Sequence, residues 1–268
     1  MTDLSADAFH LVGRLGVSAR ADVDDRVLEL FPRPEVQRHG VVRASVLAFL
    51  VDAAAGITVD DDPDLWTFTS DMSVRMRPLP APARIEARAH VLRKGRRSAT
   101  ATVELTTDGD EPVATGAIGF AKVPRRDTDP PKPQVTPGTW SAIFRGVGTL
   151  TKPLREEAGI EVLDAGGGVV QLAVTPELRN PAGTLQGALV ALVAEAAAEE
   201  LVSTRFGTPA LVTDLDLRYL AQAHSGPVRS RCRLLGSGPD APVEVELSDT
   251  SVDRVTTLVY ARATTASV

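Results

Sequence analysis

The stretch QGALVALVAEAAAEELVST, residues 186–204, decides the fold. Apolar side chains occupy almost every position from Leu189 to Ala198, and the one acid among them is Glu195. A helix that is apolar on all sides is buried on all sides. The stretch therefore predicts one long helix that is enclosed by the rest of the fold, with a single carboxylate in its apolar centre.

A second stretch, RASVLAFLVDAAAGITV at residues 43–59, matches the first at an offset of 143 residues. Asp52 falls on Glu195, and three alanines follow each acid. The same offset pairs Gly40 with Gly183, Asp71 with Asp214 and Arg75 with Arg218; an offset of 142 pairs residues 28–36 with 170–178 and 103–109 with 245–251. Self-similarity at a period of domain size indicates a duplicated domain.

Each copy has the same order of predicted elements. A short amphipathic segment (6–15; 150–158) precedes a strand (27–31; 169–174), a loop with Pro and Gly (32–40; 175–183) and the long helix (43–59; 186–204). Alternating stretches then predict antiparallel strands at 67–76, 83–92, 98–107 and 113–123, and at 210–219, 228–235, 243–248 and 254–264. This order predicts an α+β protein of two tandem hotdog domains, each a curved antiparallel sheet wrapped around one long helix.

The predicted boundaries follow from the Pro-rich, polar stretch between the copies. We expect one domain at 1–123, an extended linker at 124–140 and a second domain at 141–268. Each half exposes the edge of the strand beside its helix, so we expect the halves to pair as an intramolecular pseudo-dimer. A homodimer of the whole unit is a further possibility.

Composition narrows the class of protein. The hydrophobic fraction of 43% and charged fraction of 24% are typical of a globular protein, and the net charge of −6 argues against nucleic-acid binding. The sequence contains no apolar run long enough to span a membrane, and Asp and His interrupt residues 1–16 where a signal peptide is apolar. We therefore expect a cytoplasmic protein. The single Cys232 and four scattered histidines predict neither a disulfide nor a metal site, and we expect no cofactor.

Residues Asn180–Ala198, NPAGTLQGALVALVAEAAA, resemble the Asn-Pro-x-Gly-x-x-His-Gly-Gly signature of hotdog acyl-CoA thioesterases of the phenylacetyl-CoA and 4-hydroxybenzoyl-CoA type. Those families carry an acid nine positions after the His, where this chain has Glu195. The segment 69–105, with an Arg-Pro turn and a Gly-Arg-Arg run, is also similar to them. The resemblance covers both copies nearly end to end.

The chain departs from that signature at its central position. The family His is Gln186 in the second copy and Arg43 in the first; the following Gly is Gly187 and Ala44, and the Asn is Asn180 and Gln37. The Asp–His dyad of hotdog hydratases is also absent from the sequence. A hydratase is therefore disfavoured.

The resemblance implies two pseudo-symmetric sites, since in these families a helix-start donor of one subunit faces the carboxylate on its partner's helix. One site would place Asn180, Gln186 and Gly187 opposite Asp52, and the other Gln37, Arg43 and Ala44 opposite Glu195, with Glu199 one turn further on. A helix N-terminus offers free N–H groups to a developing oxyanion, and glycine lets a substrate approach closely. Structural alternatives stay open: an Arg43–Glu195 salt bridge in a dead site, a simple turn at Asn180, and helix packing at Gly187.

A basic run at Arg93, Lys94, Arg96 and Arg97 lies in a predicted hairpin of the first copy, where the second copy has GSGPD at residues 236–240. Four cations on an acidic protein suit the phosphates of coenzyme A, although such a run is more often a solvated turn.

The leading hypothesis is therefore a metal-independent acyl-CoA thioesterase, in which Asp52 activates water or attacks the thioester while Gly187 stabilises the oxyanion. The alternative is a non-catalytic acyl-CoA-binding protein whose site has degenerated.

Overall fold

The computed structural model describes residues 11–20, 27–107, 109–132 and 148–265. The first half contains β1 (Val17–Ala19), β2 (Leu28–Leu30), β3 (Gln37–Arg38), β4 (Val41–Val42), α1 (Ala44–Val59), β5 (Leu65–Met76), β6 (Ile85–Lys94), β7 (Ser98–Thr107) and β8 (Pro112–Pro124). The second contains α3 (Leu154–Glu157), β9 (Glu161–Asp164), β10 (Val169–Leu172), α4 (Gly187–Phe206), β11 (Ala210–Tyr219), β12 (Val228–Leu234), β13 (Val243–Asp249) and β14 (Arg254–Thr265). Short 3-10 turns lie at Val12–Arg14, Pro34–Val36 and Pro176–Leu178.

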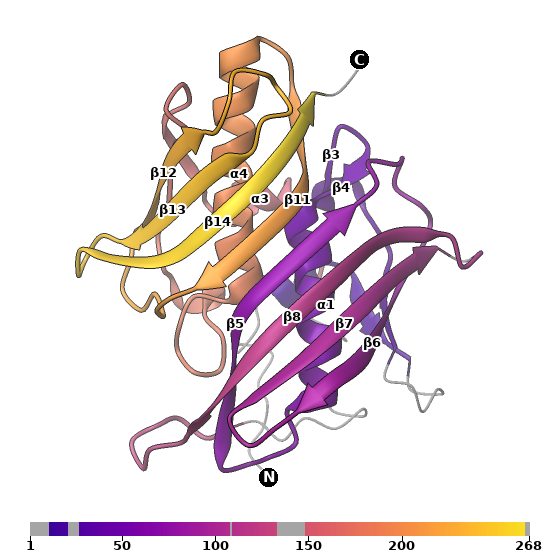
Figure 1. The fold of residues 1–268 in the computed structure, drawn as a ribbon, viewed down its shortest axis with the longest axis vertical. Helices are drawn as coiled ribbons and strands as arrows, with labels where there is room; N and C mark the ends of the chain where they lie inside the picture. Colours follow the sequence, from indigo (N-terminus) through magenta and orange to yellow (C-terminus); the bar gives the residue numbers. More distant parts are fainter. Residues whose placement is uncertain (1–10, 21–26, 108, 133–147, 266–268) are drawn as a thin grey trace.

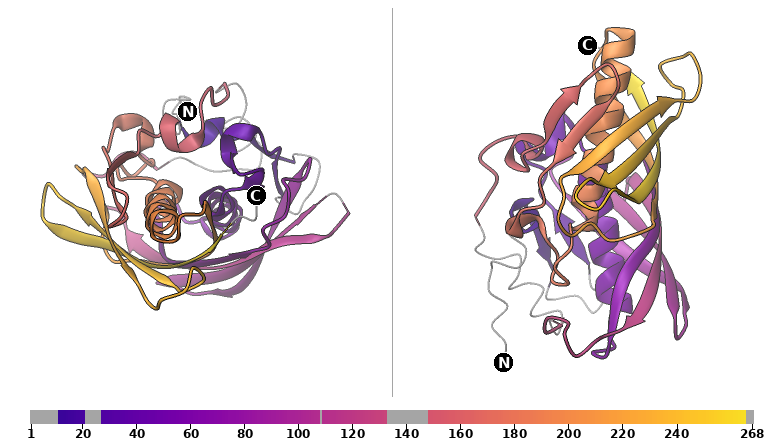
Figure 2. Two further views of the ribbon diagram at one scale, coloured as in Figure 1. Left: turned by 90° about the horizontal axis from the view of Figure 1, so that it is seen from above. Right: turned by 90° about the vertical axis from the view of Figure 1, so that its left-hand side faces the viewer.

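One curved antiparallel sheet of 12 strands carries both halves (Figure 1). Its order is β1-β2-β6-β7-β8-β5-β11-β14-β13-β12-β10-β9, so the strands of one half repeat those of the other outward from the central β5–β11 pair. The two long helices lie side by side in the concave face, and α3 and the neighbouring loops cover the side away from the sheet (Figure 2). The predicted α+β fold of two hotdog units, each with a sheet around one helix, is confirmed.

The β5–β11 pairing explains why the repeat contains an Asp and an Arg four residues apart. Asp71 lies opposite Arg218, and Arg75 lies opposite Asp214. The Arg75 Nε atom lies 3.2 Å from Asp214 Oδ1. Opposite charges across antiparallel strands stabilise their register. Duplication therefore places complementary charges on both sides of the seam, and the halves pair edge to edge as the exposed strand edges predict.

The helices are buried because the sheet curves around them. In α1 the residues Leu47, Leu50 and Val51 are fully buried, and in α4 the run Ala191–Ala198 is fully buried. The start of α1 contacts the middle of α4, and the start of α4 lies beside the middle of α1, so the two helices are antiparallel. This arrangement brings each helix N-terminus to the acid on the other helix.

A β-bulge interrupts the same strand in each half. The register of β5 against β8 shifts between Thr69 and Asp71, and that of β11 against β14 shifts between Val212 and Asp214. Before the bulge Thr69 contacts α1, whereas after it Val74 lies opposite Gly116, whose backbone abuts Val51 of α1. An extra residue changes which side chains face the helix. The bulge therefore turns Thr69 toward α1.

The predicted strands and both long helices agree with the structure to within a few residues. The edge strands β1 and β9 were not predicted, because three or four residues carry too little alternation. The predicted segment 150–158 contains only the single turn α3, and of the segment 6–15 residues 6–10 lie outside the described part. Within the described residues, no helix is long and apolar enough to cross a membrane.

The stretch between the halves is described only as far as Lys132. Trp66 donates its indole N–H to Asp129 at 3.1 Å, and the guanidinium of Arg125 lies 5.5 Å from the centre of the Trp66 ring. The stretch thus begins by packing against the first half. The boundaries at 123 and 140 stay predictions.

Candidate active site

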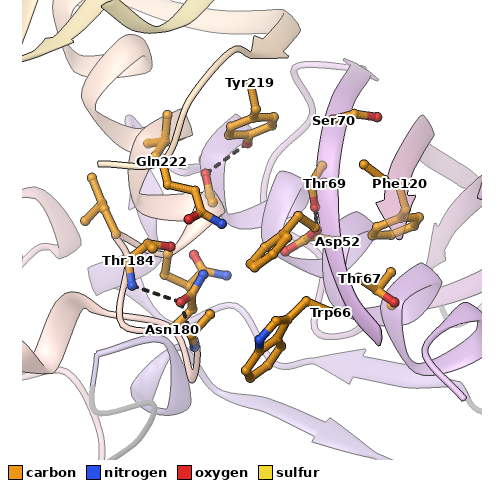
Figure 3. Close-up of a pocket in the computed structure, with 18 of the residues that line it drawn as sticks. Asp52, Trp66, Thr67, Thr69, Ser70, Phe120, Asn180, Thr184, Tyr219 and Gln222 are labelled. Atoms are coloured by element: carbon orange, nitrogen blue, oxygen red, sulfur yellow. Dashed lines mark hydrogen bonds between the residues drawn. The ribbon is translucent and has the colours of Figure 1, made fainter. Parts of the chain in front are cut away.

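A pocket of about 380 Å³ lies between α1, the start of α4 and the strand β5 (Figure 3). Its walls are mainly apolar: Phe49, Ala53, Ile57, Trp66, Phe68 and Phe120. Asp52, Asn180, Gln186 and Gly187 all line it, so the structure brings together four residues that the sequence predicted to face one another. Small-molecule sites are typically apolar cavities with a few placed polar groups.

Asp52 lies in the middle of α1 and accepts a 2.5 Å hydrogen bond from the Thr69 hydroxyl. Burial raises the pKa of the Asp52 carboxyl, and the Thr69 hydrogen bond opposes this shift by lowering it. No cation forms an ion pair with Asp52 among the described residues. A half-buried carboxylate that is desolvated and lacks a counter-charge is more basic than usual, which suits it to accept a proton.

The start of α4 faces this carboxylate. Gln186 caps the helix, because its Oε1 atom accepts the N–H groups of Ala188 and Leu189 at 2.5 and 3.3 Å. In the part of the chain that the structure describes, the N–H of Gly187 has no hydrogen-bond acceptor. A Cβ atom at Gly187 would lie 3.8 Å from Asp52 Oδ2. A free donor and a basic acceptor therefore lie on opposite sides of one small gap.

Tyr219 holds the first turn of α4 in place. Its hydroxyl donates to the Gly187 carbonyl at 3.0 Å. Burial, and secondarily the charge of Asp52, raise the pKa of Tyr219, so the phenol stays protonated and remains a donor. Asn180 shapes the preceding loop, since its Oδ1 accepts the N–H groups of Ala182 and Thr184 at 3.0 and 3.1 Å. Both residues fix the backbone that presents Gly187.

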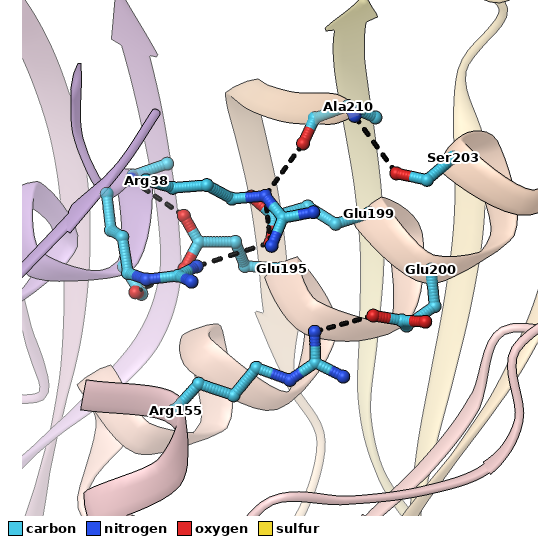
Figure 4. Close-up of polar contacts among 10 residues, drawn as sticks. Arg38, Arg155, Glu195, Glu199, Glu200, Ser203 and Ala210 are labelled. Carbon is cyan, nitrogen blue, oxygen red and sulfur yellow. Dashed lines mark hydrogen bonds and ion pairs between the residues drawn. The ribbon is translucent and has the colours of Figure 1, made fainter. Parts of the chain in front are cut away.

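The other pseudo-site is filled by charged side chains (Figure 4). Glu195 is fully buried and accepts the Ala44 N–H at 2.8 Å, the Ser45 hydroxyl at 2.5 Å and Arg43 at 3.3 Å. Arg43 also bonds Glu199 at 3.2 Å. Glu195 thus accepts the helix-start N–H of Ala44, whereas the corresponding N–H of Gly187 has no acceptor in the described part of the pocket.

Glu199 completes this charged cluster. It lies 3.2 Å from Arg38, whose Nε also donates to the Ala210 carbonyl at 2.8 Å. Burial raises the pKa of Glu199 to about 7, against the lowering effect of Arg43. Its Oε1 atom is buried without a hydrogen-bond partner among the described residues.

The two sites differ at four related positions. Gln186 stands where the cluster has Arg43, and Asp52 stands where it has Glu195. Pro181 corresponds to Arg38, and Gly56 corresponds to Glu199. Four charged residues fill the closed site, whereas the open site keeps only Asp52. The empty space of the pocket is the space that these longer side chains occupy in the other half.

The remaining predicted residues lie elsewhere. The side chain of Gln37 donates to the Pro32 carbonyl at 3.1 Å within its own loop. Arg93, Lys94, Arg96 and Arg97 are exposed in the β6–β7 hairpin. Lys94 lies 2.7 Å from Asp61, just beyond the C-terminal end of α1.

Thr69 and Tyr219 are pocket residues that the sequence interpretation missed. The bulge in β5 breaks the alternation, so periodicity alone assigns Thr69 to the wrong face. A usable signal lies in the repeat: Thr69 corresponds to Val212 and Tyr219 to Met76, a polar residue against an apolar one in both cases. Such differences between copies mark the side of the molecule where the two sites diverge.

No protein-family model and no curated protein sequence matches the chain. Solved structures do match over nearly its whole length. A candidate thioesterase from Novosphingobium aromaticivorans is 19% identical with a TM-score of 0.61, and the match covers 94% of this chain and 98% of the other. A hot dog fold protein of unknown function from Alicyclobacillus acidocaldarius is 14% identical with a TM-score of 0.62, covering 96% and 98%.

The chain has the double-hotdog fold. The TesB protein of Mycobacterium avium subspecies paratuberculosis matches equally well, at 12% identity, a TM-score of 0.63 and coverage of 96% and 98%. At such identities the likeness establishes the fold of this double-hotdog protein. Within the described ranges, no three His, Cys, Asp or Glu side chains are grouped to hold a metal ion.

Proposed function

We propose that this double-hotdog protein hydrolyses the thioester bond of an acyl-CoA at the Asp52 pocket, without a metal ion. The observation that carries the proposal is the juxtaposition of a half-buried, unpaired carboxylate and the free Gly187 N–H across an apolar pocket. Thioesterases among the structurally similar proteins support the same reaction class.

The geometry suits a direct attack by water. The thioester carbonyl oxygen accepts the Gly187 N–H, which stabilises the negative charge that develops there, aided by the positive end of the α4 dipole. Asp52 takes a proton from water as the oxygen of that water bonds to the carbonyl carbon. The tetrahedral intermediate then expels the thiolate as the C–S bond breaks, and Asp52 returns the proton to sulfur. The products are a carboxylic acid and free coenzyme A.

Neighbouring side chains orient these groups. The Thr69 hydroxyl holds one oxygen of Asp52, so the other is directed to the gap beside Gly187. The Oε1 atom of Gln186 accepts the helix N–H groups, so its amide N–H₂ is available to donate to the water or the thioester. Gln186 thereby takes the position of the family His without titrating.

A second route has Asp52 attack the carbonyl carbon and form a mixed anhydride, which water then cleaves. Single turnover in water labelled with heavy oxygen tests the anhydride. Label in the protein identifies an anhydride that water cleaves at the Asp52 carbon, whereas direct attack places the label in the released acid alone. Trapping of the acyl-enzyme with hydroxylamine detects an anhydride that water cleaves at the acyl carbon.

We assign the Glu195 cluster a structural role. Glu195 already accepts three hydrogen bonds, one of them from the helix-start N–H that a thioester oxygen would need. Arg43, Glu195 and Glu199 therefore tie α1 to α4, and one active site per chain is expected. The alternative is that these residues form a second catalytic site.

Release of free thiol from a panel of acyl-CoAs tests the proposal. Asp52→Asn should lower kcat at least ~100-fold while substrate affinity changes little, because the base is lost and the shape is kept. Glu195→Gln is the matched control, since it makes the same change at the repeat-related position; it should retain most of the kcat.

A large loss with Glu195→Gln and none with Asp52→Asn would move the active site to the other half. Wild-type protein that binds acyl-CoA without releasing thiol would favour the non-catalytic binding protein instead.

A further inference from the structure

The pocket extends along one face of α1, away from the start of α4. The pocket is lined by Phe49, Asp52, Ala53, Gly56 and Ile57 of α1 and by Asp60, which directly follows the helix. Steps of three and four residues keep these side chains on one helix face. From Asp52 to Asp60 the helix rises by about 12 Å. The pocket is therefore an elongated chamber that starts at the reacting groups and follows α1 to its C-terminal end.

Gly56 keeps the middle of this chamber open. A Cβ atom at Gly56 would meet nothing within 4 Å. Glycine inside a helix is unfavourable, so its presence calls for a reason. At the repeat-related position Glu199 fills the corresponding space with a buried side chain. The absence of a side chain at Gly56 thus separates an open chamber from a filled one.

Lys132 closes the far end. Its ammonium donates to Asp60 Oδ1 at 2.6 Å and to the carbonyls of Asp62 and Leu65 at 2.7 Å each. The Thr67 hydroxyl donates to the same Asp60 oxygen at 2.6 Å. The Lys132 side chain is only 5% exposed. All three donors of the ammonium are used, so none is left for a ligand.

The pocket opens to solvent on the other side of Asp52. Gln222 is exposed and lies across Asp52 from Thr67 (Figure 3). Leu220, which is 59% exposed, also lines the pocket. A thioester held between Asp52 and Gly187 can therefore direct its carrier toward Leu220 and its acyl chain along α1.

We propose that the acyl chain of the substrate lies along α1 past Gly56, and that the Asp60–Lys132 pair ends the chamber and so limits chain length. The inference rests on the proposed function. The walls are apolar, and the Lys132 ammonium at the end is neutralised by Asp60 and has no donor left for an anionic group. The chamber therefore suits an unbranched hydrocarbon chain of limited length and disfavours one that ends in a carboxylate.

The test is the dependence of kcat/KM on chain length, for saturated acyl-CoAs from butanoyl to palmitoyl, normalised within each variant. Gly56→Leu should shift the maximum to shorter chains, with a loss of about tenfold for the longest chain that the wild type favours. Lys132→Ala should shift the maximum to longer chains. Lys132→Met, which keeps most of the volume, should not. The exposed Lys152→Ala is the matched control and should leave the profile as it is.

Binding measures the chamber without catalysis. Calorimetric titration of the same variants with saturated free fatty acids, made in the Asp52→Asn background, should show the same two opposite shifts. If the two variants shift fatty-acid binding in opposite directions but the wild-type protein releases no thiol from acyl-CoAs, the proposed hydrolysis is refuted and the chamber is supported. Thiol release with identical chain-length profiles for wild type, Gly56→Leu and Lys132→Ala would overturn the chamber alone.

Discussion

Asp52 and Glu195 occupy the same position of the repeat but face different surroundings. Glu195 reaches the helix-start N–H of Ala44 directly, at 2.8 Å, and Arg43 balances its charge. Asp52 is one methylene shorter, and Gln186 replaces the arginine. The shorter side chain leaves room beside Gly187, and the missing cation leaves the carboxylate more basic. Together with Pro181 and Gly56 in place of Arg38 and Glu199, these differences separate a structural tie from a reactive site.

The pH dependence of turnover should depend on Thr69. Its hydrogen bond stabilises the charged form of Asp52 and lowers the Asp52 pKa, which burial raises. Thr69→Val removes that bond, so the pKa rises further and more of the enzyme is protonated at any given pH. The acid limb of the kcat/KM profile should then move up by about one pH unit. Thr67→Val, whose hydroxyl bonds Asp60, is the control and should leave the limb in place.

Removing a charge should lower the unfolding free energy at the Glu195 cluster but not at the Asp52 pocket. Arg43→Met leaves Glu195 and Glu199 buried without their shared cation, which should cost roughly 3–5 kcal/mol of unfolding free energy. Asp52→Asn removes a half-buried, unpaired charge and should leave stability unchanged or slightly raised. Chemical denaturation of both variants measures this. A large loss for Asp52→Asn would show that its carboxylate is structural.

At the scale of elements, Gly56 makes α1 less stable but leaves space for the pocket. Gly56 lies inside α1 at a position where alanine would be more favourable. Gly56→Ala adds a methyl group that meets no atom within 4 Å, so the unfolding free energy should rise by about 0.5–1 kcal/mol. The melting temperature should rise by about 2 °C, measured by circular dichroism. A fall would mean that the pocket wall is tighter than the structure shows.

The strands show a limit of periodicity. The long strands β5 to β8 and β11 to β14 alternate clearly, and the sequence predicts them well. The bulges near Ser70 and Thr213 leave no sequence signal, because an extra residue on one strand is defined only by the partner strand. Thr69 faces Asp52 as a result of that pairing.

At the scale of the whole molecule, the proposed site belongs to neither half alone. Asp52 and Thr69 come from the first half, and Gln186, Gly187 and Tyr219 come from the second. The β5–β11 seam joins the halves within the sheet, and the Glu195–Ala44 hydrogen bond joins their helices. Fusion of two copies in one chain therefore allows one site to close while the other stays open.

Variants of the basic β6–β7 hairpin can show from which end of the pocket the substrate enters. Lys94, Arg96 and Lys122 line a surface recess that Asp62 and Leu65 share, next to the end that Lys132 closes. If the acyl chain follows α1, coenzyme A leaves at the opposite end. The double variant Arg96→Ala/Arg97→Ala should then raise the KM of acyl-CoA and of acyl-pantetheine equally, if at all, at low salt.

A selective rise in the KM of acyl-CoA, shrinking at high salt, would instead support the sequence-based prediction that the hairpin binds phosphate. It would also reverse the direction in which the acyl chain enters the chamber.

The sequence by itself determined the duplication, the enclosed helices and the order of strands, since these follow from local periodicity and from comparing two copies of one pattern. Which residues meet at the helix starts was implied by the resemblance to hotdog thioesterases and not by the pattern itself. Only the tertiary structure decided which site is open. Whether Asp52 or Glu195 has a cation beside it depends on side chains that lie more than a hundred residues apart in sequence. The position of Thr69 depends on a bulge, and that of Lys132 depends on how the connecting segment packs against the first half. Charge compensation and free volume are properties of these long-range contacts, so a linear pattern does not contain them.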